Sequence, residues 1–125
     1  MDFKKLANQY RDELLDNVLP FWLEHSQDIE FGGYFSCLDR EGKVFDTDKF
    51  IWLQGREVWM FSMLYNKVEK RQEWLDCAVQ GGEFLKKYGH DGQFNWYFSL
   101  DRSGRPLVEP VSYTHLRAHE TVLDL

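Results

Sequence analysis

Apolar side chains recur every three or four residues near the start of the chain, with Lys, Asp, Glu and Arg between them. This spacing places the apolar positions on one face of a helix and the charged positions on the other. The pattern predicts a helix over residues 3–22, bent or ended near Pro20, because proline cannot donate a helical hydrogen bond. The predicted apolar face contains Phe3, Leu6, Ala7, Tyr10, Leu14, Val18 and Phe21.

A hairpin and two more helices are predicted next. Residues 34–38 and 43–45 can extend, and DREG between them has turn chemistry, which predicts a β-hairpin. Helical spacing returns at about 49–70 and again at 72–88, where Gly89 offers a stop at the C-terminal end.

The hairpin sequence then comes back, which indicates an internal repeat. YFSCLDREGKV at 34–44 and YFSLDRSGRPL at 97–107 share the YFS, LDR and Gly elements in the same order. The unit is therefore hairpin, helix, helix, hairpin. Helix pairs of this kind bury their apolar faces by stacking in an array or closed ring. A chain with little more than one unit is too short to close such a ring.

One arginine stands in an apolar run, KFIWLQGREVWMF at 49–61. On a helix, Trp52, Arg56 and Trp59 share a face. Indole rings cover the C–H patches of a sugar and a guanidinium holds its oxygen atoms, so this face suits a carbohydrate. The alternative is a buried arginine that pairs with Glu57 or Asp48, or that stacks on tryptophan for packing alone.

Composition and charge narrow the class of protein. The 125 residues are 43% hydrophobic and 17% aromatic, which suits a single globular domain. A net charge of −6 makes nucleic acid an unsuitable partner. We find no membrane-spanning stretch and no signal peptide, and we expect a cytoplasmic protein. Cys37 and Cys77 lack metal-site spacing and are expected to be reduced thiols.

The last fifteen residues differ in character from the rest. His115 and His119 are four apart, but Leu116 follows the first histidine where the zinc motif HExxH needs its Glu, so we predict no metal site. The stretch VSYTHLRAHET resembles the in-frame translation of a transposase adapter used in preparing sequencing libraries. We therefore divide the chain into residues 1–110 and a non-native tail, 111–125.

Residues 1–110 resemble the N-acylglucosamine 2-epimerase family. The resemblance rests on FWLEHSQDIEFGGYFSCLDREGKVFDTDKFIWLQGREVWMFSMLYN at 21–66 and continues through WLDCAVQGGEFLKKYG and GQFNWYFSLDRSGRPLVEP. It implies the N-terminal part of an (α/α)6 barrel, mainly α with short β-hairpins, whose inner helices line a sugar pocket.

The resemblance also implies a reaction. The family interconverts N-acetylglucosamine and N-acetylmannosamine by removing the proton at C2 and returning it to the opposite face, through an enediolate. Arg56 matches the family's WLQGR arginine, which implies that it binds sugar oxygens and stabilises the enediolate, so we expect its charge to be buried with a substrate oxygen as its partner; we assign Trp52 and Trp59 to substrate binding. The family's two acid/base histidines have no counterpart here, so we expect the chain alone to be inactive.

Several alternatives stay open. One alternative for the whole protein is a neutral-sugar aldose–ketose isomerase or a cellobiose 2-epimerase of the same superfamily. Another is a non-catalytic helical-repeat module that binds a protein. We expect no cofactor or metal, although a nucleotide effector and a homodimer are open for the whole protein. His25 and His90 are expected in a loop and a turn, Gly32 and Gly33 in hairpin geometry, and the Gly81–Gly82 pair at a close helix contact.

Overall fold

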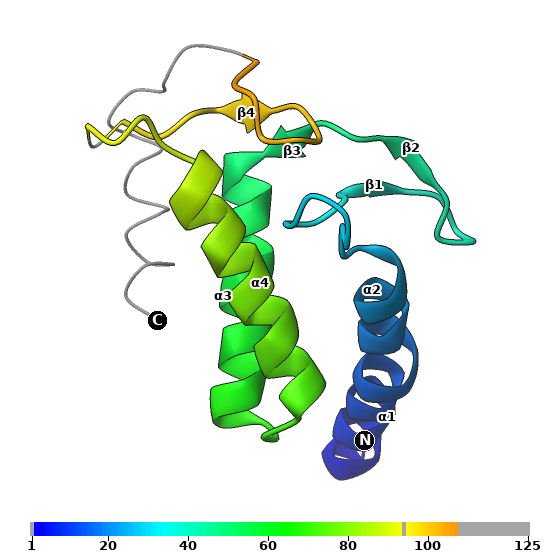
Figure 1. The fold of residues 1–125 in the computed structure, drawn as a ribbon. Coiled ribbons are helices and arrows are strands. Elements are labelled where there is room, and N and C mark those ends of the chain that lie inside the picture. The colour runs from blue at the N-terminus through cyan, green and yellow to red at the C-terminus, as the bar shows by residue number, and fades with distance from the viewer. Residues whose placement is uncertain (1, 94, 108–125) are drawn as a thin grey trace.

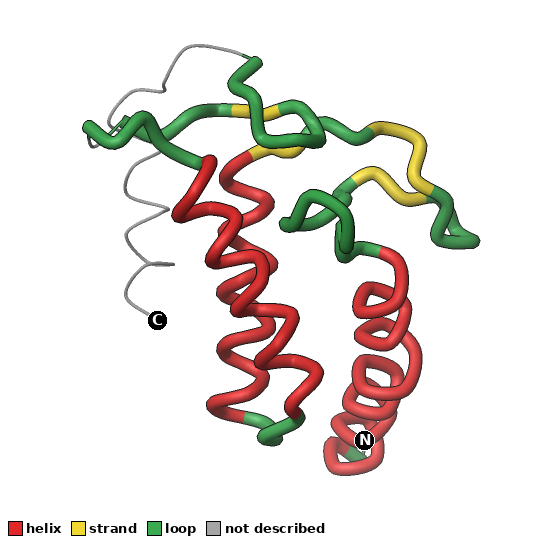
Figure 2. Tube along the Cα trace, viewed as in Figure 1, coloured by secondary structure: helices red, strands yellow, loops and turns green. Residues whose placement is uncertain are grey.

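The computed structural model describes residues 2–93 and 95–107 of the chain. Figure 1 shows two long helices side by side, an N-terminal helical segment next to them and short strands across one end, and Figure 2 shows the same division into helical and extended parts. No helix in the described ranges is long and apolar enough to cross a membrane. The elements are α1 (Phe3–Glu13), η1 (Leu14–Val18), α2 (Leu19–His25), β1 (Cys37–Leu38), β2 (Val44–Asp46), β3 (Lys49–Phe50), α3 (Ile51–Lys67), α4 (Gln72–Tyr88) and β4 (Ser99–Leu100).

The N-terminal segment is helical from Phe3 to His25, three residues longer than the predicted 3–22. It does not end at Pro20, which lies in the first turn of α2. The five-residue π-helical segment η1 comes just before it. A π turn is a common way to pass a residue that cannot make the regular helical hydrogen bond, so the predicted irregularity occurs one turn earlier.

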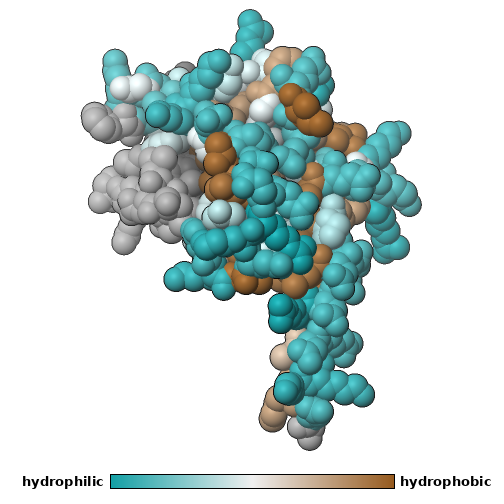
Figure 3. All heavy atoms as spheres, turned by 60° about the horizontal axis from the view of Figure 1, so that its bottom comes forward, coloured by the Kyte–Doolittle hydropathy of each residue, from teal (hydrophilic) through white to brown (hydrophobic). Residues whose placement is uncertain are grey.

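The apolar face of this segment is largely uncovered within the described residues. No side chain of α1 is buried, and Phe3 and Tyr10 are 75% and 68% exposed. Burial begins at Leu15 and Leu19, which reach the core. Figure 3 shows the segment extending away from the rest of the molecule. The periodicity therefore predicted the helix correctly, but it did not reveal whether the apolar face has a partner.

The core lies mainly between α3 and α4, which pack along their whole lengths. Phe61 from α3 and Trp74 from α4 are fully buried there. The helix predicted at 49–70 begins later, at Ile51, because Lys49 and Phe50 pair with β4 as β3. Helix α4 has the predicted bounds, but Gly89 follows it in right-handed conformation, with a φ of −75°. A Cβ at Gly89 would lie 2.6 Å from the Leu85 carbonyl oxygen, so close packing rather than a left-handed turn requires glycine.

Both copies of the repeated sequence form the same turn. In the first, the Asp39 carboxylate accepts the N–H groups of Glu41 and Lys43, and β1 pairs with β2 as predicted. The second copy differs in its strands. β4 pairs mainly with β3, and the return of its own hairpin is reduced to a bridge between Leu100 and Pro106.

Two glutamines hold the loop between α2 and β1 against the helix pair. Gln54 of α3 accepts the N–H of Tyr34 and donates to its carbonyl oxygen, both at 2.8 Å. Gln80 of α4 makes the same pair of bonds to Gly33, at 2.8 and 3.1 Å. The Tyr34 hydroxyl lies where a side chain at Gly81 would stand, 2.1 Å from a Cβ built there. Gly81 thus leaves room for the Tyr34 side chain, whereas we expected it to allow a close contact between two helices.

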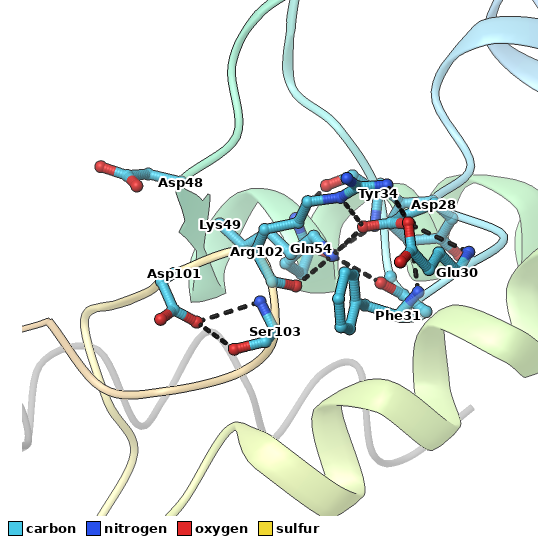
Figure 4. A network of polar contacts seen from close by, with 12 residues as sticks. Asp28, Glu30, Phe31, Tyr34, Asp48, Lys49, Gln54, Asp101, Arg102 and Ser103 are labelled. Carbon is cyan, nitrogen blue, oxygen red and sulfur yellow. Dashed lines mark hydrogen bonds and ion pairs between the residues drawn. The ribbon is translucent and has the colours of Figure 1, made fainter.

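A buried ion cluster joins three segments: Asp28 from the loop after α2, Lys49 from β3 and Arg102 from the turn after β4 (Figure 4). The Lys49 ammonium is fully buried and donates to Asp28 at 2.7 Å and to the carbonyl oxygens of Gly32 and Arg102 at 2.7 and 2.9 Å. The Arg102 guanidinium donates to both oxygens of the same carboxylate. Burying a charge is costly unless it is paired and hydrogen-bonded, and here the three protons of the ammonium all have acceptors.

Candidate functional site

Trp52, Arg56 and Trp59 lie on one exposed face of α3, as their spacing predicted. The two indoles are 41% and 37% exposed. The Arg56 guanidinium carbon lies 5.3 Å from the centre of the Trp52 ring. A cation over an exposed indole gains about 0.5–1 kcal/mol, enough to favour one orientation of the side chain without holding it rigidly. We call these three residues the α3 face.

Arg56 is exposed, so the expectation that its charge is buried was wrong. Within the described residues, neither of the two suggested carboxylates pairs with it. Glu57 instead contacts Ser26 at 2.7 Å. The guanidinium therefore makes a stacking contact but no hydrogen bond to the described part of the chain, and its N–H groups are free to bind oxygen atoms of a ligand.

The opposite side of α3 fixes the position of this face. Val58, Phe61 and Leu64 are buried against the core, and Gln54 is held by the backbone of Tyr34. A helix anchored on one side by packing and by a bidentate amide presents its other side with a well-defined backbone.

The histidines of the described residues lie away from the α3 face. His25 ends α2, beside Glu24 at 3.7 Å, rather than lying in the loop. His90 follows α4 in a turn, as expected, where its Nδ1 accepts the Gly92 N–H and its ring lies 5.0 Å from that of Trp96. His115 and His119 fall outside the described residues. Within them, no group of three His, Cys, Asp or Glu side chains could hold a metal ion.

Glu57 is the one acidic residue of α3, and the sequence pattern suggested it only as a partner for Arg56. Burial raises its pKa to about 7, against the smaller lowering effect of the hydrogen bond with Ser26. Its spacing carried a signal, because Phe61 and Leu64, four and seven residues further along the helix, are buried on the same face.

A groove of about 640 Å³ lies elsewhere, between residues 27–32 and α4. It contains no residue of the α3 face. Two of its polar residues, Asp28 and Gln80, are already bonded to Lys49 and Gly33 and so hold the loop, and four of its other polar residues are the acids Glu30, Asp76 and Glu83 and the base Lys87. We therefore place the candidate site on the α3 face.

Comparison with known proteins supplies the context for that face. Residues 33–118 match the family described as N-acylglucosamine 2-epimerase (GlcNAc 2-epimerase). The chain belongs to this family. Over 101 residues it is 50% identical to an N-acylglucosamine 2-epimerase of Mus musculus, a match that covers 77% of this chain and 24% of that protein. It is 32% identical over 109 residues to a cellobiose 2-epimerase of Dictyoglomus turgidum, which covers 86% of this chain and 28% of the relative.

The fold of this N-acylglucosamine 2-epimerase family member also matches solved structures. A sugar epimerase from a ruminal bacterium superimposes with a TM-score of 0.82 at 27% identity, over 94% of this chain and 30% of that one. The predicted fold class, part of an (α/α)6 barrel with short hairpins, is thereby confirmed. The chain spans about a quarter of the length of the curated relatives it matches. The family match runs to residue 118, so it includes residues 111–118 of the tail. The foreign origin of residues 111–125, which lie outside the described residues, stays a prediction.

Proposed function

We propose that the whole protein is a sugar 2-epimerase that interconverts N-acetylglucosamine and N-acetylmannosamine. The observation that supports this substrate is the difference in identity, 50% to an N-acylglucosamine 2-epimerase against 32% to a cellobiose 2-epimerase. The same comparison keeps the cellobiose 2-epimerase, with disaccharide or neutral-sugar substrates, as the second candidate.

The α3 face provides part of the chemistry that this reaction needs. Epimerisation removes the proton beside the carbonyl of the open-chain sugar, and negative charge develops on the enediolate oxygens. In this proposal the unpaired Arg56 guanidinium donates to those oxygens, where a preorganised donor stabilises the transition state more than the ground state. The half-exposed rings of Trp52 and Trp59 cover the apolar side of the sugar.

The proton transfers need an acid/base pair that the described residues do not place at this face. His25 and His90 are engaged in other contacts, as described above. We therefore expect the 125-residue chain to show no epimerase activity. Measurable exchange of the C2 proton of N-acetylmannosamine with solvent deuterium, catalysed by this chain, would contradict that expectation.

Sugar binding by the complete protein tests the role of Arg56. N-acetylglucosamine should change the tryptophan fluorescence, and Arg56→Ala should weaken that response by about tenfold or more, as expected for loss of a charged hydrogen-bond donor. Arg40→Ala is the matched variant, since Arg40 is also exposed, and it should leave the response unchanged. A complete protein that does not respond to the sugar would instead favour a protein-binding helical-repeat module.

Substrate choice separates the two epimerase candidates. Turnover of N-acetylmannosamine, but not of mannose or cellobiose, is the expected result for the complete protein. Turnover of cellobiose or mannose alone would favour the second candidate. We also propose a cytoplasmic protein whose partner is a small sugar rather than nucleic acid or a membrane, without a bound cofactor, with nucleotide binding and a homodimer left to direct measurement.

A further inference from the structure

The Ser26 hydroxyl lies within hydrogen-bond distance of two oxygen atoms. Its hydroxyl oxygen is 2.6 Å from the Trp22 carbonyl oxygen and 2.7 Å from Oε2 of Glu57. Both separations are typical of O–H···O hydrogen bonds. Ser26 is fully buried, so water does not compete for either position.

A serine hydroxyl carries one hydrogen, so it can donate to only one of these two acceptors. The Trp22 carbonyl has no proton to give, and it lies four residues back along α2, where a serine at the end of a helix commonly donates. If the hydroxyl donates to Trp22, the contact with Glu57 is a hydrogen bond only when the Glu57 carboxyl carries the proton. If the hydroxyl donates to Glu57 instead, two oxygens remain 2.6 Å apart with no hydrogen between them.

We propose that Glu57 is held as a neutral carboxylic acid that donates its proton to Ser26, and that this bond is a pH-sensitive latch between the end of α2 and the middle of α3. The surroundings of the carboxyl agree with a neutral group. Burial raises its pKa to about 7, and within the described residues no cation pairs with it. When Glu57 is neutral, the Ser26 hydroxyl donates to the Trp22 carbonyl and accepts from Glu57 at the same time. When Glu57 is ionised, the hydroxyl can make only one of these two hydrogen bonds.

The two titratable groups that face Glu57 from other elements, Cys77 and Tyr34, stay neutral in the same range of pH. Cys77 faces Glu57 from α4, and burial raises the pKa of its thiol to about 12. Tyr34 approaches from the loop before β1, and burial raises the pKa of its hydroxyl further still. On α2 itself, His25 and Glu24 lie beside each other at 3.7 Å. Of Glu57, Cys77 and Tyr34, it is therefore Glu57 that loses its proton in this range.

The latch predicts the direction in which the stability of the fold changes with pH. The native state keeps a proton that the unfolded chain releases above its ordinary pKa of 4.5. The stabilisation from the latch is therefore complete below that value, and is lost as pH rises toward and through about 7.

Glu57→Gln tests the proposal, because the amide can donate to Ser26 as the neutral acid does but cannot lose the proton. Between about pH 5 and about pH 7, the unfolding constant of the unmodified chain should rise relative to that of the variant by up to about tenfold per pH unit. His25 is present in both proteins and cancels in this comparison. Glu83→Gln, an exposed glutamate of α4, should leave the profile unchanged.

Infrared spectroscopy of the unmodified chain gives a second readout that does not depend on how stable a variant is. At about pH 6, carboxyl groups with ordinary pKa values are ionised. A carboxylic acid band at that pH, absent in Glu57→Gln and present in Glu83→Gln, would support the latch. Parallel unfolding profiles, or the absence of the band, would show that Glu57 is ionised and would overturn it.

Discussion

The two LDR turns have the same local structure but different tertiary roles. Asp39 and Asp101 each accept the backbone N–H groups two and four residues further along, at 2.8–3.0 Å. Gly42 and Gly104 each adopt a left-handed conformation, with φ of +89° and +102°. The next residue after the aspartate behaves differently, since Arg102 joins the buried ion cluster whereas Arg40 is exposed and makes no ion pair within the described residues.

The difference arises from what each turn meets. The second turn follows β4, which is paired with β3, so it is delivered next to Lys49 and Asp28. The first turn lies against the end of α2, where a Cβ at Gly42 would come within 2.3 Å of the His25 ring. Four neighbouring residues are thus enough to specify a turn, while the partner of its arginine depends on strand pairing between distant segments.

The largest effect is expected when the carboxylate of the cluster is removed. Asp28→Asn leaves the fully buried Lys49 without a counter-charge and should lower the free energy of unfolding by about 3–5 kcal/mol. Urea unfolding followed by circular dichroism measures this. If the variant does not fold, the pair Asp28→Leu with Lys49→Met should restore folding, because apolar residues can replace a buried ion pair. If Asp28→Asn were as stable as the unmodified chain, the ion cluster would not stabilise the fold, and it would not explain the difference between the two turns.

The glycines test whether the two turns are equivalent in backbone structure. Gly42→Ala and Gly104→Ala should each cost about 1–3 kcal/mol, because each needs positive φ and each meets a ring. At Gly92, φ is +83° and nothing lies within 4 Å of an added Cβ, so Gly92→Ala reports the backbone strain alone and should cost less. Thermal unfolding of the three variants gives the comparison, and unequal costs at the two turns would weaken their equivalence.

The arginines test the difference between the turns directly. Arg102→Ala should destabilise the fold measurably, but less than Asp28→Asn, because Lys49 still pairs with the carboxylate. Arg40→Ala should change the free energy of unfolding by about 0.5 kcal/mol or less, as for other exposed positions. Equal effects in denaturant titrations would mean that Arg102, the half-buried member of the ion cluster, contributes nothing to its stability.

The smallest effect should appear on acidification. Burial raises the pKa of Asp28, but the hydrogen bonds from Arg102 and Lys49 outweigh it and hold the pKa below the usual value of 3.8. Stability from this ionised group is present above that value and is lost as pH falls through the lowered pKa. Arg102→Ala removes one lowering contact, so acid unfolding should begin at a slightly higher pH, whereas Arg40→Ala should leave the acid midpoint unchanged.

Much of the local structure could be predicted from the sequence, because it depends on neighbours. The turns at Asp39 and Asp101, the bounds of α4 and the shared face of Trp52 and Arg56 all follow from spacing. Periodicity shows which residues share a face, but not whether that face is covered, so the exposure of Arg56 was missed. Nor does it show which distant groups meet, so neither the burial of Lys49 nor the contact of Glu57 with Ser26 was predicted.

The two glutamines that hold residues 33 and 34 have a consequence for the backbone of the loop. Gly33 and Tyr34 are buried, where water cannot take up a hydrogen bond that the protein leaves unmade. The side-chain amides of Gln54 and Gln80 bond to the N–H and C=O groups of Tyr34 and Gly33. The loop can therefore pass over the helix pair without a sheet to satisfy its backbone, and the loss of either amide would leave buried peptide groups unpaired.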